Sequence, residues 1–116
     1  MQEPVTVTGT IVVPEGVAPG PPATVHVRVE DVSLADAPSV TVASAVLPNV
    51  PMPPDAPVAF WLVVGGFDPS RTYSVRVHVD RDGDGRVSTG DLVSTSHHGV
   101  LTRGAGTEVT VPVSVV

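Results

Sequence analysis

Regularly spaced carboxylates are the feature of this 116-residue sequence with the clearest chemical meaning. The stretch VDRDGDGRVSTGDL, from Val79 to Leu92, fits the D-x-D-x-D-G-x5-D spacing of an EF-hand-type calcium loop. Calcium is a hard cation that takes six to eight oxygen ligands, and alternate side chains of a tight loop turn toward one centre. The spacing therefore predicts calcium as the cofactor of this protein.

Six residues make up the predicted metal site. Arg86 would contribute its backbone carbonyl, and Ser88 would bind directly or through a water. Asp91 would close the loop with a side chain shorter than the usual glutamate, which lowers coordination number or affinity. A glycine at Gly85 allows the sharp bend that such a loop needs. The predicted ligands are Asp80, Asp82, Asp84, Arg86, Ser88 and Asp91.

The same stretch has a simpler interpretation as a solvated hairpin turn, because Asp-Gly pairs are favoured in tight turns between strands. The match at all twelve positions favours calcium, and without a cation the carboxylates would repel one another. Patterns typical of strands, not of amphipathic helices, flank the loop. We therefore expect a calcium clip that stabilises a hairpin, and not a sensor that opens a groove.

The four histidines suggest weaker alternatives. His97 and His98 are adjacent, so on a strand their side chains would point to opposite faces, and we expect an exposed loop pair. His26 and His78 occupy outward positions of two predicted strands. If those strands pair, the imidazoles approach each other and could form a zinc site or a pH-sensitive pair.

Composition excludes several classes of function. The formal net charge is −6 and all six basic residues are arginines, so we expect neither nucleic-acid nor anionic-membrane binding. No apolar run reaches the roughly 18–20 residues that a membrane span requires. Cysteine is absent, which excludes thiolate chemistry. No G-x-S-x-G or Walker motif occurs, so we expect no enzymatic activity; a pocket holding His26 or His78 against a carboxylate with a shifted pKa would favour an enzyme.

The segments that must position these residues look like strands. Valine is the commonest residue and favours strands, while aromatic residues make up only 3%, so the core must be aliphatic. Apolar and polar residues alternate along several segments, as in half-buried strands. The predicted strands are Val5–Val13, Ala23–Asp31, Ser39–Leu47, Val58–Val64, Arg71–Asp80 and Thr107–Val116, with one or two more between residues 91 and 106.

Two segments differ from this alternation. Val58–Val64 is apolar on both faces, which predicts a central strand that is buried on both sides. Pro48–Pro57 is rich in proline, which donates no hydrogen bond to a sheet, so it is not a central strand. Ser33–Pro38 reads as a loop or a single helical turn. The sequence thus predicts an all-β protein: a single-domain β-sandwich over residues 1–116 with seven to eight short strands, immunoglobulin- or transthyretin-like.

The ordered motifs resemble those of the YbaY/YscW-type lipoprotein family. GTIVVPEGVAPGPPATVHVRVEDVSLADAP (9–38) resembles the family's opening strands and the DvS-ADAP segment that follows them. PVAFWLVV (57–64), FDPSRTYSVRVHV (67–79) and GVLTRG (99–104) resemble later segments in the same order. The chain departs from the family pattern in two respects. It contains no lipobox cysteine, and the aspartate-rich loop replaces a shorter hairpin.

This resemblance implies a compact β-sandwich and a role like that of pilotins, small lipoproteins that help a type III secretion secretin reach the outer membrane. We therefore expect a non-enzymatic, calcium-stabilised accessory or binding module, chaperone-like, with a protein partner at a sheet edge or loop. The alternative is a structural or adhesive β-domain of a surface protein whose loop is rigidified by calcium. The address expected from the chain as written is cytoplasmic, or periplasmic or extracellular if an export segment precedes it.

Overall fold

The computed structural model describes residues 3–34 and 36–116, and in these residues it contains strands and no helix. Ala35, within the segment predicted as a loop or helical turn, lies outside the described residues. The strands are β1 (Val5–Val12), β2 (Gly20–Asp31), β3 (Val40–Met52), β4 (Val58–Val64), β5 (Tyr73–Asp80), β6 (Leu92–Val93), β7 (Gly99–Val100), β8 (Glu108–Pro112) and β9 (Ser114–Val115). The described residues include no helix that is long and apolar enough to span a membrane.

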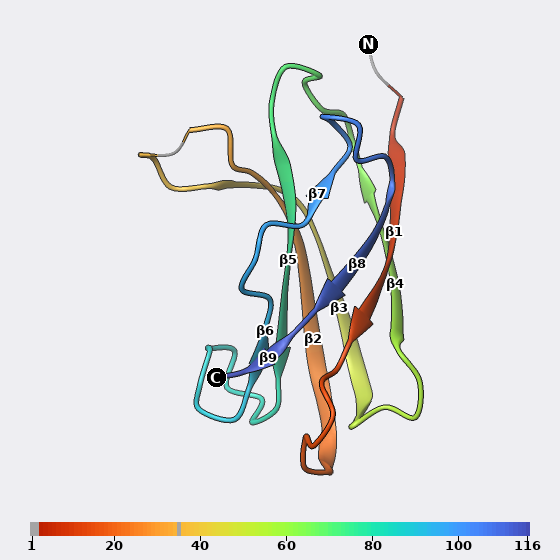
Figure 1. The fold of residues 1–116 in the computed structure, drawn as a ribbon, viewed down its shortest axis with the longest axis vertical. Helices are drawn as coiled ribbons and strands as arrows, with labels where there is room; N and C mark the ends of the chain where they lie inside the picture. Colours follow the sequence, from red (N-terminus) through yellow and green to blue (C-terminus); the bar gives the residue numbers. More distant parts are fainter. Residues whose placement is uncertain (1–2, 35) are drawn as a thin grey trace.

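Two sheets form a β-sandwich, as predicted (Figure 1). One sheet has the order β4-β1-β8, in which β1 pairs antiparallel with β4 and parallel with β8. The other has the order β3-β2-β5-β6-β9, and β7 also pairs with β5. The nine described strands exceed the predicted seven to eight because short two-residue strands occur near the C-terminus.

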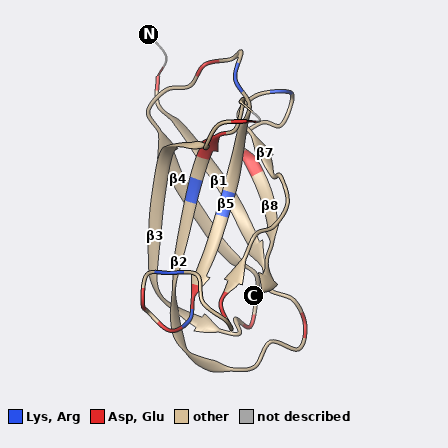
Figure 2. Ribbon diagram, turned by 90° about the vertical axis from the view of Figure 1, so that its left-hand side faces the viewer, with Lys and Arg blue, Asp and Glu red and all other residues tan. Residues whose placement is uncertain are grey.

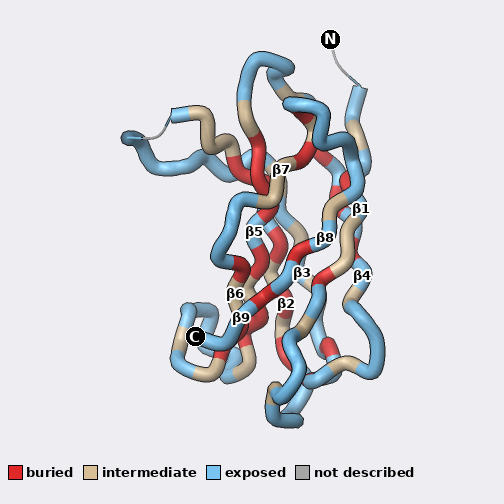
Figure 3. The backbone as a smooth tube through the Cα atoms, in the orientation of Figure 1, coloured by how far each residue is buried: buried red, intermediate tan, exposed pale blue. Residues whose placement is uncertain are grey.

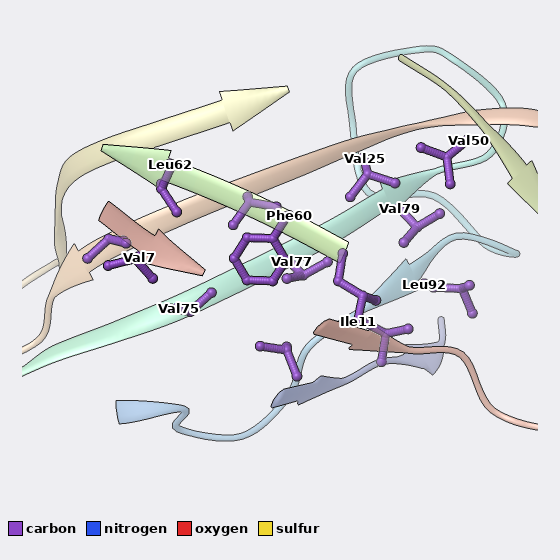
Figure 4. Packing of buried hydrophobic residues seen from close by; sticks show 14 of the residues in the cluster. Val7, Ile11, Val25, Val50, Phe60, Leu62, Val75, Val77, Val79 and Leu92 are labelled. Atoms are coloured by element: carbon purple, nitrogen blue, oxygen red, sulfur yellow. The ribbon is translucent and has the colours of Figure 1, made fainter. Parts of the chain in front are cut away.

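Aliphatic residues from both sheets form the core (Figure 4). In the larger sheet, the alternating valines of β2 and β5 all point inward, as their period of two predicted. From the smaller sheet, Val7, Ile11, Phe60 and Leu62 face them. Figure 3 shows that the buried residues concentrate along these strands. The core is therefore continuous between the sheets and rests on β-branched residues.

Glycine is needed at position 9 of β1, where the Phe60 ring packs against the backbone. It lies opposite Phe60 of β4 and Val109 of β8 in the strand register. A Cβ atom at this position would clash with the Phe60 ring and lie 2.8 Å from the Val109 carbonyl oxygen. Glycine thus lets the aromatic ring of Phe60 cover the middle of β1.

The prediction of a doubly buried central strand at Val58–Val64 is wrong. β4 lies at the edge of the smaller sheet, and its residues alternate between buried and exposed. Trp61 is 67% exposed and Val63 is 50% exposed. Apolar residues alone could not reveal this, because no second layer of the described chain covers the outer face of this short sheet.

The strands at residues 40–52 and 107–116 also differ from their predicted bounds. β3 continues beyond the predicted end at Leu47, through Pro48 and Pro51 to Met52. It is an edge strand, where a missing N–H donor is tolerated, which agrees with the prediction that the proline-rich segment is not a central strand. The last predicted strand divides into β8, in the smaller sheet, and β9, in the larger one. Val115 of β9 is consequently 54% exposed.

Candidate metal loop and its histidine support

Residues 80–91, the aspartate loop, connect β5 to β6 and gather charges of both signs at one end of the sandwich (Figure 2). β5 delivers its last residue, Asp80, into the loop, and β6 begins directly after Asp91. Both of these carboxylates are buried, at 2% and 1% exposure, whereas Asp82 and Asp84 are exposed. The two ends of the loop are thus anchored in the sheet and its middle faces solvent.

The structure brings the four predicted aspartates together. Each of Asp80, Asp82, Asp84 and Asp91 offers a carboxylate oxygen, and these four oxygens lie within 4.8 Å of one another. Four carboxylates at this spacing match the donor chemistry that calcium prefers. The acidic group therefore has the composition and the compactness of a calcium-binding loop.

The remaining two predicted ligands lie beside the same carboxylates. The Ser88 hydroxyl donates a hydrogen bond to Asp84 Oδ2 at 2.9 Å and lies 3.4 Å from the Arg86 carbonyl oxygen. The Asp84 carboxylate, the Ser88 hydroxyl and the Arg86 carbonyl are therefore neighbours. Ser88 and Arg86 thus lie next to one carboxylate of the acidic group, that of Asp84.

Backbone hydrogen bonds hold the loop in this form. Asp80 Oδ1 accepts a hydrogen bond from the Gly83 amide at 2.9 Å, and Oδ2 accepts one from the Gly85 amide at 2.8 Å. Both glycines have positive φ angles, 74° and 78°, which residues with a side chain rarely adopt. The glycines therefore curl the chain around the Asp80 carboxylate.

Asp91 is the most constrained carboxylate of the loop. Its Oδ1 accepts a hydrogen bond from the Arg81 amide at 2.9 Å, while Oδ2 accepts one from the Ser88 amide at 3.1 Å. The same Oδ2 lies 2.8 Å from His78 Nε2. Burial raises the pKa of Asp91, but the hydrogen bonds from His78 and the two amides outweigh it, so the pKa is lowered overall. Asp91 is therefore held as a carboxylate.

His78 is the residue of this site that the spacing motif did not include. It precedes the loop on β5, directly opposite His26 of β2 in the strand register. The two rings stack nearly parallel, with centroids 5.6 Å apart and an interplanar angle of 18°. The strand pairing on which the histidine hypothesis depended is thus confirmed, and its zinc and pH-sensitive roles stay hypotheses. His97 is exposed and His98 is half-buried in the chain between β6 and β7.

The contact between His78 and Asp91 also bears on catalysis. A hollow of about 380 Å³ is lined by both stacked histidines and by Ser44, whereas Asp91, the carboxylate with the lowered pKa, contacts His78 but is not among the residues that line the hollow. Nucleophilic catalysis further requires a hydroxyl bonded to the histidine. Among the described residues, no serine or threonine hydroxyl hydrogen-bonds to either imidazole. The geometry therefore makes His78 a positioning group for the loop.

A second contact ties the loop to a distant part of the chain. The Arg81 guanidinium donates a hydrogen bond to the Ala18 carbonyl oxygen at 2.6 Å, in the connection between β1 and β2. The guanidinium also lies against Gly20. The loop is thus braced from outside its own hairpin, which no local sequence signal indicated.

Comparison with known proteins agrees with this architecture. The family model of the type III secretion system lipoprotein chaperone (YscW) matches residues 2–113. A solved structure, an alternative pilotin from the type II secretion system of Vibrio cholerae, is similar with a TM-score of 0.76 and 27% sequence identity. That alignment covers 97% of this chain and 98% of the pilotin chain. A search of curated proteins found no match.

The family match spans nearly the whole chain, and the structural similarity extends over both sheets. The resemblance inferred from the ordered sequence motifs is therefore confirmed, and this family is one of secretion chaperones, not a class of enzymes. The chain belongs to the YscW family of type III secretion system lipoprotein chaperones.

Proposed function

We propose that this protein is a non-enzymatic accessory module of a bacterial secretion system that binds a protein partner in the manner of a chaperone. The observation that carries the proposal is the end-to-end structural similarity to a pilotin. Two unrelated proteins could share a single site by chance. Similarity over the whole fold with 27% sequence identity points to common descent, so it supports a related role. The role implied is to help a secretin reach the outer membrane.

The host organism provides the test of this role. Deletion of the coding sequence is expected to reduce the amount of secretin in the outer-membrane fraction and to reduce secretion of a reporter substrate. Re-expression of the full chain should restore both. Unchanged secretin distribution and unchanged secretion in the deletion strain would contradict the proposal.

We further propose that calcium binds the aspartate loop and stabilises the β5–β6 hairpin. Four clustered carboxylates, the neighbouring Ser88 hydroxyl and the Arg86 carbonyl supply oxygen ligands of the kind that calcium prefers. His78 and the backbone amides orient Asp91, as outer partners commonly orient a metal ligand. A cation would also reduce the repulsion among the carboxylates.

Isothermal titration calorimetry tests the calcium proposal directly. Wild-type protein should release or absorb heat with a stoichiometry near one calcium per chain. Asp82→Ala removes an exposed carboxylate and should abolish the signal. Asp55→Ala, at an aspartate in the β3–β4 connection outside the loop, is the matched control and should bind like the wild type. Equal binding by the Asp82→Ala variant would contradict the assigned site.

A further inference from the structure

The edges of the two sheets differ in how they are protected against pairing with another strand. In the described chain, β4 and β8 end one sheet, and β3 and β9 end the other. β8 carries the charged Glu108 and Pro112, and β9 has only two residues. A charge, a proline or a short length each hinders the pairing of an edge with another strand. Residues 40–47 of β3 and all of β4 contain neither a charge nor a proline. Of the described edges, which also include that of the two-residue β7 on β5, those of β3 and β4 are therefore open to an added strand.

These two open edges lie on either side of a groove of about 540 Å³, the edge groove. It is lined by residues 44–47 of β3 and residues 59–63 of β4. All nine are uncharged, and Figure 2 shows no charged residue along β3. Val46, Trp61 and Val63 are each at least half exposed. Apolar side chains gathered at a surface groove in this way are typical of an interaction site.

We propose that the edge groove binds an extended segment of the protein partner, which adds to the smaller sheet as a strand beside β4. The proposal rests on the proposed chaperone role and specifies the surface that would carry it. The free N–H and C=O groups along β4 would bond to the main chain of the incoming strand. Its outward side chains would cover Trp61 and Val63, and its inward side chains would face Ala45 and Leu47 of β3.

The chemistry of the groove defines the segment. Its centre should be uncharged and rich in β-branched or aliphatic residues, because a charge placed between the sheets would lose water without gaining a partner. Residues flanking this centre should be basic, since the protein carries a net charge of −6. The same net charge disfavours a second copy of the chain as the occupant. A helix would leave the edge N–H and C=O groups of β4 unpaired.

The single tryptophan of the chain makes the groove directly observable. Trp61 is 67% exposed, so covering it should shift its fluorescence to shorter wavelength. A random twelve-residue peptide library displayed on phage would be selected against the full chain, and the enriched peptides would be titrated with tryptophan emission as the readout. We expect peptides with alternating apolar residues and an uncharged centre, whose binding is lost when a central residue is replaced by proline.

Variants of the protein locate the binding surface. Val63→Lys and Val46→Lys place charges on the two sides of the groove and should weaken peptide binding about tenfold or more. Val115→Lys is the matched control, because this valine is 54% exposed on β9, at the far edge of the larger sheet. It should leave peptide affinity unchanged. Thermal melts of all three variants verify that the fold is retained.

Several results would overturn the proposal. They are an absence of peptides that shift the Trp61 emission, enriched peptides with helical i, i+4 apolar spacing, and peptide binding that Val63→Lys does not weaken. Self-association abolished by Val63→Lys would instead assign the groove to a second copy. The peptide titration needs neither calcium nor a secretion system. Its failure is therefore distinct from a failure of the proposed function, which the deletion strain reports.

Discussion

The aspartate loop and the edge groove differ in nearly every physical property. The loop consists of twelve consecutive residues, concentrates charge, and satisfies its carboxylates with hydrogen bonds from its own backbone. The groove is built from two strands of different sheets, has no charged lining residue, and leaves two strand edges unpaired in the described chain. The loop thus satisfies its polar groups within its own hairpin, whereas the groove lies between strand edges that have no neighbouring strand in the described chain.

This difference separates stability from recognition. Binding of a cation to the loop would act on the folded state by mass action and change little elsewhere. Binding at the groove would use surface that the folded protein already exposes, so it need not affect the core. Substitutions in the two regions should therefore have separable effects.

The largest effect should distinguish two neighbours on β4. Phe60 is 4% exposed and covers Gly9, whereas Trp61 points to the outer face. Phe60→Ala should reduce the free energy of unfolding by about 3–5 kcal/mol, the usual cost of removing a buried aromatic ring. Trp61→Ala should change it by no more than about 0.5 kcal/mol. Chemical denaturation measures both, and equal losses would show that Trp61 belongs to the core and not to a docking surface.

An intermediate effect should distinguish two aspartates of the loop. In chelator, Asp91→Ala should reduce the free energy of unfolding by about 2–3 kcal/mol, because it leaves two backbone amides and His78 without their acceptor. Asp82→Ala should unfold near the wild-type midpoint, since Asp82 is exposed. A stable Asp91→Ala variant would mean that the hydrogen-bonded form of the loop contributes little without calcium.

The smallest effect on the free energy of unfolding should appear at acidic pH, from two aspartates that lie outside both the aspartate loop and the edge groove. Hydrogen bonds from Ser33 and Ser70 lower the pKa values of Asp31 and Asp68 below 3.8. The unfolded chain therefore binds protons at higher pH than the folded one, so stability falls as the pH drops through about 4 and below. Urea denaturation at a series of acidic pH values measures how steeply the free energy of unfolding falls with pH. Ser33→Ala and Ser70→Ala should flatten this dependence, and an unchanged dependence would contradict the assignment.

Much of the fold followed from local periodicity. Alternating valines predicted β2 and β5 because every second residue of a strand faces the same side. Periodicity could not place β4 at an edge, since seven apolar residues suit either a buried strand or an exposed binding edge. It also could not show that the chain changes sheets at Val113, because that change depends on tertiary pairing.

The candidate sites differ in the same way. The aspartate loop was found from spacing alone, because its four aspartates are close in sequence and glycines mark its bends. The support from His78 and Arg81 depends on the pairing of β5 with β2 and on contact with the β1–β2 connection. The edge groove had no sequence signal beyond uncharged, proline-free segments. Sites assembled from distant strands require the structure.

The central claim about the loop is tested most directly by thermal melting of the wild-type protein with calcium, with magnesium and with chelator. At calcium concentrations about 100-fold above the dissociation constant, stability should rise by about 2.7 kcal/mol, which corresponds to a melting temperature higher by roughly 10 °C. Magnesium should produce a smaller shift, and Asp82→Ala should show none. An unchanged melting temperature at millimolar calcium, with no heat of binding, would contradict the calcium clip.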